Sequence, residues 1–161
     1  MSESLKITIT SMVSHEDLPG TDLEYVVRND MDSAIWLVND GWLTWRQMGP
    51  EIELSYARGR MRTGAQVFGY FPPDTVKIPP GEQLTRTIHL KWPQALDRLW
   101  NTASEANPAP GKYRVSVRIG YGATPGPEPS RSGEGVEEPV LRWQQEAVSE
   151  SAMMTVFGSN S

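Results

Sequence analysis

The sequence contains no cysteine and only two histidines among its 161 residues. Without cysteine there is no disulfide bridge, no thiolate metal site and no cysteine nucleophile, and such a chain fits a reducing compartment. The N-terminus is acidic and polar and carries no apolar run of the kind found in secretory signals. These features together predict a cytoplasmic protein.

Long hydrophobic runs are also absent. The longest apolar region, residues 34–43, is interrupted by Asn39 and Asp40. It is well short of the ~20 consecutive apolar residues that a membrane-spanning helix requires. We therefore expect no membrane insertion.

Positive charge is scarce, because 15 lysines and arginines stand against 20 acidic residues and leave a net charge of −5. Nucleic-acid binding needs clustered lysine and arginine to neutralise phosphates, so we expect no nucleic-acid partner. The single basic cluster comprises Arg58, Arg60 and Arg62, in a segment that we interpret as a solvated turn or a partner-binding loop. An acidic surface of this kind suits a basic partner.

The sequence offers little that would support catalysis. We expect His15 in a loop and His89 on a strand face beside threonines, and no sequence signal places the two together. No serine lies in a Gly-x-Ser-x-Gly turn, and the Gly-rich residues 120–135 lack the Lys-Ser/Thr ending of a phosphate loop. A hydrolytic enzyme would need the histidines within about 7 Å of each other or of a carboxylate pocket. We predict a non-catalytic protein without a cofactor.

Two polar segments are candidates for a calcium site. Their oxygen donors are Asn29, Asp30, Asp32, Asn39 and Asp40. Calcium accepts about six to eight oxygens in flexible geometry, but the spacing matches no calcium-loop signature. Asn and Asp are also the residues that stabilise turns, because their side chains bond to the nearby backbone. The turn interpretation is favoured, and we predict no metal site.

Period-2 alternation of apolar and polar residues dominates the chain and predicts β-strands. The clearest strands are expected at residues 5–10 and 113–121, where Tyr113 and Val117 would face the core. The spacing of Leu96, Leu99 and Trp100 predicts a short helical segment near residues 93–101. Residues 122–138 are rich in Gly, Pro, Ser and Glu and predict a long flexible loop. Further strands are expected at residues 22–28, 34–38, 52–56, 66–71, 76–78 and 84–90, with an ambiguous extended segment at 42–48 and a hairpin or one bent strand over 140–148 and 152–157.

Seven to nine short strands with frequent turn signals and almost no helical period predict an all-β protein, and specifically an antiparallel β-sandwich. The length fits a single domain over residues 1–161, with its core within residues 5–157.

Four signals follow one another along the chain. An early strand ends in the polar turn of residues 25–30, Pro-Gly turns open the strands after residues 78–82 and 110–113, and the last region carries Trp143 and the Val-Ser step at residue 148. Their order resembles bacterial immunoglobulin-like β-sandwich domains, including the intracellular proteinase-inhibitor type. The resemblance extends over residues 5–157 and implies an immunoglobulin-like fold, with Trp143 in the core.

Six tryptophans are many for a chain of this length. We expect Trp36 in the core, whereas Trp42 and Trp45 lie near turns, where aromatic rings favour partner binding. The predicted partner-binding residues are therefore Trp42, Trp45, Arg58, Arg60 and Arg62.

We interpret the chain as a non-catalytic intracellular protein-binding domain, such as an inhibitor or immunity-type protein that blocks an enzyme or toxin. The alternative is a carbohydrate-binding module in which Trp42 and Trp45 form a stacking platform. The sequence indicates no oligomeric state.

Overall fold

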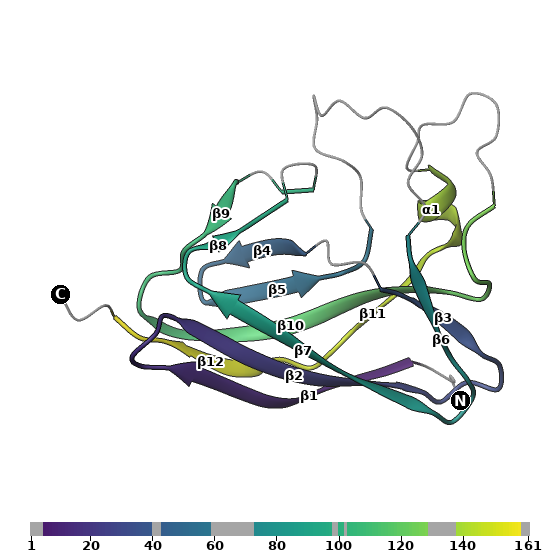
Figure 1. Ribbon diagram of the computed structural model, residues 1–161, viewed down its shortest axis with the longest axis horizontal. Helices are drawn as coiled ribbons and strands as arrows, with labels where there is room; N and C mark the ends of the chain where they lie inside the picture. The colour runs from purple at the N-terminus through teal and green to yellow at the C-terminus, as the bar shows by residue number, and fades with distance from the viewer. Residues whose placement is uncertain are drawn as a thin grey trace.

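Strands dominate the computed structural model, which describes residues 5–39, 43–58, 73–97, 100–101, 103–128 and 138–158 (Figure 1). The prediction of an all-β protein is confirmed, although the strands are more numerous than expected. The described residues form twelve strands and one helix, which are β1 Leu5–His15, β2 Gly20–Asn29, β3 Ile35–Val38, β4 Thr44–Met48, β5 Glu51–Ser55, β6 Thr75–Ile78, β7 Gln83–Lys91, β8 Gln94–Ala95, β9 Glu105–Ala106, β10 Gly111–Gly122, α1 Glu138–Trp143, β11 Gln145–Val148 and β12 Ala152–Val156.

The first sheet has three strands in the order β1-β2-β7, and both pairings are antiparallel. Strand β2 buries Leu23, Tyr25 and Val27, while the residues between them are only half-buried, as the alternation predicts. A bulge shifts the register of β1 between Ile9 and Ser11. The sheet therefore has one apolar face and one polar face.

The second sheet is built around β10, the longest strand. The path β4-β5-β10-β3-β6 runs through it, and β11 and β12 also pair with β10. Because β5 and β12 both pair with residues 114–115, they lie on opposite edges of β10. The β5–β10 pairing is parallel, so the prediction of a wholly antiparallel fold is wrong at this one contact. The hairpin from β4 reverses the chain and gives β5 this direction.

The core lies between these two sheets. Both contribute fully buried side chains, among them Leu23 and Val27 from β2 and Val115 and Val117 from β10. Tyr113 is also buried, so the predicted core face of this strand is confirmed. The opposite face of β10 is left for polar residues, and this face carries the site described below.

The helix predicted near residues 93–101 is wrong for the described residues of that segment. Residues 94–95 form β8, which pairs with β9, and Asn101 donates its backbone N–H to the carbonyl of Asp97 in a single turn at 3.1 Å. Leu96 is buried in the loop after β8, and Leu99 lies outside the described residues.

The helix of the described chain is instead α1, within a region predicted as strand. Glycine at position 122 allows Trp143 of this helix to lie against β10, since a Cβ at this position would overlap the indole ring. The predicted strand at 66–71 lies outside the described residues. So do residues 129–137 of the predicted loop, and β10 continues to Gly122 where that loop was expected to begin.

Candidate binding site

Of the five predicted partner-binding residues, only Trp45 and Arg58 lie within the described residues; Trp42, Arg60 and Arg62 fall outside them. The ring of Trp45 is half-buried and meets Trp92 edge-on, with centroids 5.6 Å apart and an interplanar angle of 80°. Arg58 is only 7% exposed, and its guanidinium lies 5.5 Å from the ring centroid of Trp100. Neither side chain is the exposed anchor that the sequence suggested.

Arg58 is held in place through its backbone. The side-chain amide of Gln144 accepts a hydrogen bond from the backbone N–H of Arg58 at 2.8 Å and donates one to the backbone carbonyl of Arg58 at 2.7 Å. Gly120 makes room for this amide, because a Cβ there would overlap it. The interpretation of a solvated turn is therefore wrong at Arg58, which is tied to the segment before β11.

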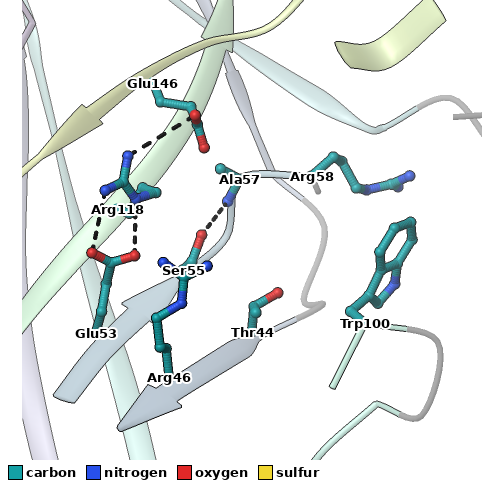
Figure 2. A pocket seen from close by; sticks show the side chains of 9 residues that line it. All are labelled: Thr44, Arg46, Glu53, Ser55, Ala57, Arg58, Trp100, Arg118 and Glu146. Carbon is teal, nitrogen blue, oxygen red and sulfur yellow. Dashed lines mark hydrogen bonds and ion pairs between the residues drawn. The ribbon is translucent and has the colours of Figure 1, made fainter. Parts of the chain in front are cut away.

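A polar pocket of about 380 Å³ opens on the outer face of β4, β5 and β10. Figure 2 labels its nine lining residues, and we call it the arginine pocket. Its walls alternate along the strands with the buried positions Ile52, Leu54 and Val117, so the sheet pleat directs its polar residues outward. The charged lining residues are Arg46, Arg58, Arg118, Glu53 and Glu146.

The carboxylate of Glu53 forms an ion pair with Arg118. Two hydrogen bonds join them, from Nε at 2.9 Å and Nη2 at 3.3 Å, and Glu146 lies 3.9 Å from Nη1. The hydrogen bonding of Arg118 to Glu53 is the main reason that the pKa of Arg118 is raised. A two-point arginine–carboxylate pair of this kind is geometrically specific. It fixes the floor of the arginine pocket.

Arg46 stands directly opposite Glu53 in the β4–β5 ladder, yet it forms no ion pair with any residue in the described ranges. Its side chain extends toward Ser55 in the pocket (Figure 2). Further along the same face, Arg114 is paired with Glu51 at 3.0 Å. Arg46 is therefore a cation whose opposite carboxylate is already committed to another arginine.

A groove of about 500 Å³ runs beside β4, between this edge strand and the β8–β9 hairpin. We call it the β4 groove; its lining includes Trp45, Gln47, Trp100, Asn101 and Glu105. Trp100 lines both this groove and the arginine pocket, so the two hollows are neighbours.

The side chain of Asn101 occupies one end of the β4 edge in the manner of a neighbouring strand. Its Oδ1 accepts a hydrogen bond from the backbone N–H of Trp45 at 2.8 Å, and its Nδ2 donates to the carbonyl of Leu43 at 3.1 Å. Asn101 is only 3% exposed. Sequence reasoning missed this residue, and no sequence signal marked it, because the backbone groups that it bonds at residues 43 and 45 are more than fifty positions away.

Beyond Asn101 no strand or side chain in the described ranges pairs with the β4 edge. Backbone groups of alternate residues in an antiparallel strand point to the same side, so those of Gln47 point outward, as those of Trp45 do. The described part of the chain supplies no partner for the N–H of Gln47. Met48, next along the strand, is 73% exposed. This open edge lies where the sequence was ambiguous.

The two histidines meet on the outer face of the first sheet, contrary to expectation. His15, which ends β1 and is not in a loop, contacts Oδ2 of Asp22 through Nε2 at 2.8 Å, and Nδ1 of His89 contacts Oδ1 at 2.7 Å. The hydrogen bond from His89, followed by that from His15, lowers the pKa of Asp22. Both histidines therefore reach one carboxylate, which meets the distance set above for a hydrolytic enzyme, but all three side chains are well exposed and not enclosed in a pocket. The described residues contain no His, Asp and Glu group arranged to hold a metal ion.

Two of the candidate calcium donors have other roles. Asn29 is fully buried, and its Oδ1 accepts a hydrogen bond from the N–H of Met31 at 2.9 Å, as the turn interpretation expects. Asp30 pairs with Arg28 at 2.6 Å. Asp40 lies outside the described residues.

Two tryptophans predicted in the core are only half-buried. Trp36 lies beneath the ammonium group of Lys77, 5.7 Å from the ring centroid. Trp143 of α1 donates from Nε1 to the hydroxyl and the carbonyl of Thr124. Placement in the core is therefore wrong for both rings, which cover the sheet from outside.

No protein-family model matches this chain, and comparisons with curated proteins and with solved structures gave no match either. Nor do the described residues include a helix of the length and apolar character that crossing a membrane demands. The geometry of the site is therefore the basis for assigning a function.

Proposed function

We propose that this protein is a non-catalytic binding domain that receives an extended segment of a partner protein on the open edge of β4, within the β4 groove. The observation that carries this proposal is the edge itself. Asn101 already satisfies the groups at residues 43 and 45 as a strand would, while Gln47 keeps an outward N–H. In strand addition the main chain supplies affinity, and pockets for alternate side chains supply specificity.

The surroundings of β4 suit such a partner. An added strand in the β4 groove would lie beside Trp45 and Trp100, and Trp100 also borders the polar arginine pocket. An inhibitor or immunity-type protein that blocks an enzyme or toxin would use a rigid site of this kind. The cytoplasmic location and the basic character of the whole partner, which rest on composition, stay predictions.

We also propose that the two main sheets form an immunoglobulin-like sandwich. Two features support this arrangement: the core is drawn from both sheets, and the chain passes from one sheet to the other between β2 and β3 and again between β6 and β7. Connections between sheets of this kind are typical of Greek-key sandwiches.

A display selection with randomised extended nonapeptides tests the proposed function. Selected peptides should bind the unaltered protein but lose at least about tenfold in affinity with Gln47→Pro, because proline removes the outward N–H and its ring crowds the edge. Gln47→Ala is the matched control, since it removes the side chain and keeps the N–H. Thermal melts should show that both variants are folded. Equal affinity for the proline variant would contradict strand addition at β4.

The carbohydrate-binding alternative has no support from a specific contact among the described residues. Trp45, half of the expected stacking platform, already packs against Trp92, and Trp42 lies outside the described residues. Titration with oligosaccharides, followed by tryptophan fluorescence, would reveal sugar binding if it occurs.

A further inference from the structure

The charge of Arg46 on β4 indicates what kind of segment would bind there. Glu53 faces Arg46 across the ladder, but its two oxygens are engaged by Arg118. Arg118 contacts both glutamates of the arginine pocket, and the guanidinium of Arg58 lies over Trp100. Arg46 forms no ion pair with any residue in the described ranges. Arg46 is therefore complementary to a single negative charge.

We propose that the segment bound at β4 carries an aspartate or glutamate opposite Arg46, and an apolar residue two positions away opposite Met48. This inference rests on the proposed function and specifies the chemistry of the partner. The carboxylate enters the arginine pocket and pairs with Arg46, and the apolar residue covers the exposed side chain of Met48.

The register of β4 limits the contacts to these two positions. Side chains at 44, 46 and 48 share the outer face of the sheet, so an added strand would place alternate residues beside them. Asn101 already takes the backbone groups on either side of position 44, which blocks strand pairing there. Positions 46 and 48 remain, one cationic and one apolar and flexible. A methionine suits this role because its unbranched side chain adapts to different partners.

The same arginine disfavours a second copy of this chain as the occupant. Two β4 edges paired with each other would bring the Arg46 side chains of both copies to one short interface. Like charges on neighbouring strands are destabilising, and charged residues on short edges are a common way of avoiding self-pairing. An acidic segment would be attracted to Arg46 and not repelled by it. Arg46 therefore favours an acidic partner segment over a second copy of this chain.

The test uses three sets of phage-displayed nonapeptides whose central residue is Asp, Ser or Lys and whose other positions are randomised. Against the unaltered protein, the Asp set should be enriched at least about tenfold over the Ser set, and the Lys set should be depleted. Enriched Asp peptides should share an apolar residue two positions from the centre. With Arg46→Glu the order should reverse, so that Lys peptides are enriched.

Lys91→Glu is the control variant, because it changes the net charge by the same amount as Arg46→Glu. Lys91 is an exposed residue of β7, in the other sheet. This variant should leave the preference for Asp unchanged. Thermal melts check that both variants are folded, and Arg46→Gln, which should abolish the preference without reversing it, serves if Arg46→Glu does not fold.

The outcomes separate this inference from the function on which it rests. Equal enrichment of the three sets, with binding that Gln47→Pro abolishes, would overturn the acidic preference and leave strand addition standing. An Asp preference that survives Gln47→Pro and depends on Arg46 would keep the carboxylate site and overturn strand addition. A preference for Asp that Arg46→Glu does not change would overturn the assignment to Arg46, and failure to enrich any set would overturn both proposals.

Discussion

Asn29 should be one of the most sensitive polar positions in the protein. It ends β2, and its side chain is fully buried. Its Nδ2 donates to the carbonyls of Ser33 and Ile78, both at 2.9 Å, and its Oδ1 accepts from Met31. Its backbone is bonded to the turn at residues 81–82 as well. One side chain therefore connects the end of β2, the turn into β3 and the end of β6.

The cost of Asn29→Ala follows from these bonds. The substitution removes three side-chain hydrogen bonds and leaves two carbonyls and one N–H without their partner. A buried polar group without a hydrogen bond costs about 1–3 kcal/mol, and two of these three sites are only part-buried. We therefore expect a loss of roughly 3–5 kcal/mol in the free energy of unfolding, a large share of the 5–15 kcal/mol typical of a domain.

Urea unfolding followed by tryptophan fluorescence measures this loss. Asn29→Asp has the same shape but turns both donated hydrogen bonds into contacts between oxygens, so it should destabilise at least as strongly. Asp32→Asn, on an exposed residue of the same loop, is the control and should change stability by less than about 0.5 kcal/mol. A cost below about 1 kcal/mol for Asn29→Ala would refute the conclusion that this side chain holds the junction together.

Two further predictions concern the outer faces of the sheets. Gly122→Ala should destabilise by about 1–3 kcal/mol and alter tryptophan fluorescence, because the new Cβ displaces the Trp143 ring, whereas Gly126→Ala, with no atom near its Cβ, should do neither. Acid should destabilise the unaltered protein more than Asp22→Asn. The fold lowers the pKa of Asp22 below its usual value of 3.8, so the stability that its ionised form contributes is present above this pH and is lost as pH falls through the lowered pKa. Urea midpoints at about pH 5 and pH 2 would show this difference, and parallel losses in both proteins would contradict it.

The prediction of strands succeeded where one face is buried and the other is solvated. In β2 and β10 the apolar residues fall on alternate positions, and the structure buries Leu23, Val27, Val115 and Val117 as expected. The pattern is local, since each residue reports its own environment. It failed at α1, because Val140 packs inward from a six-residue helix that is too short to show a helical period.

The candidate site could not be derived in the same way. Sequence analysis found Trp45 and Arg58 but predicted both to be exposed, whereas Arg58 is buried and Trp45 packs against Trp92. It missed Arg46 and Asn101, whose roles depend on residues far along the chain. An arginine in a sequence shows a charge but does not show whether a carboxylate is already taken by another arginine.

The amino-acid order by itself determined that this chain forms β-strands, which faces of those strands are apolar, and that cysteine chemistry is absent, because these are properties of single residues and their immediate neighbours. Only the tertiary structure decided that His15 and His89 share one carboxylate, that Asn101 stands in for a strand, and that Arg46 is left over beside an open edge. These contacts depend on the register between strands. Register is set by how distant segments pack, and a shift of one residue would move every side chain to the opposite face.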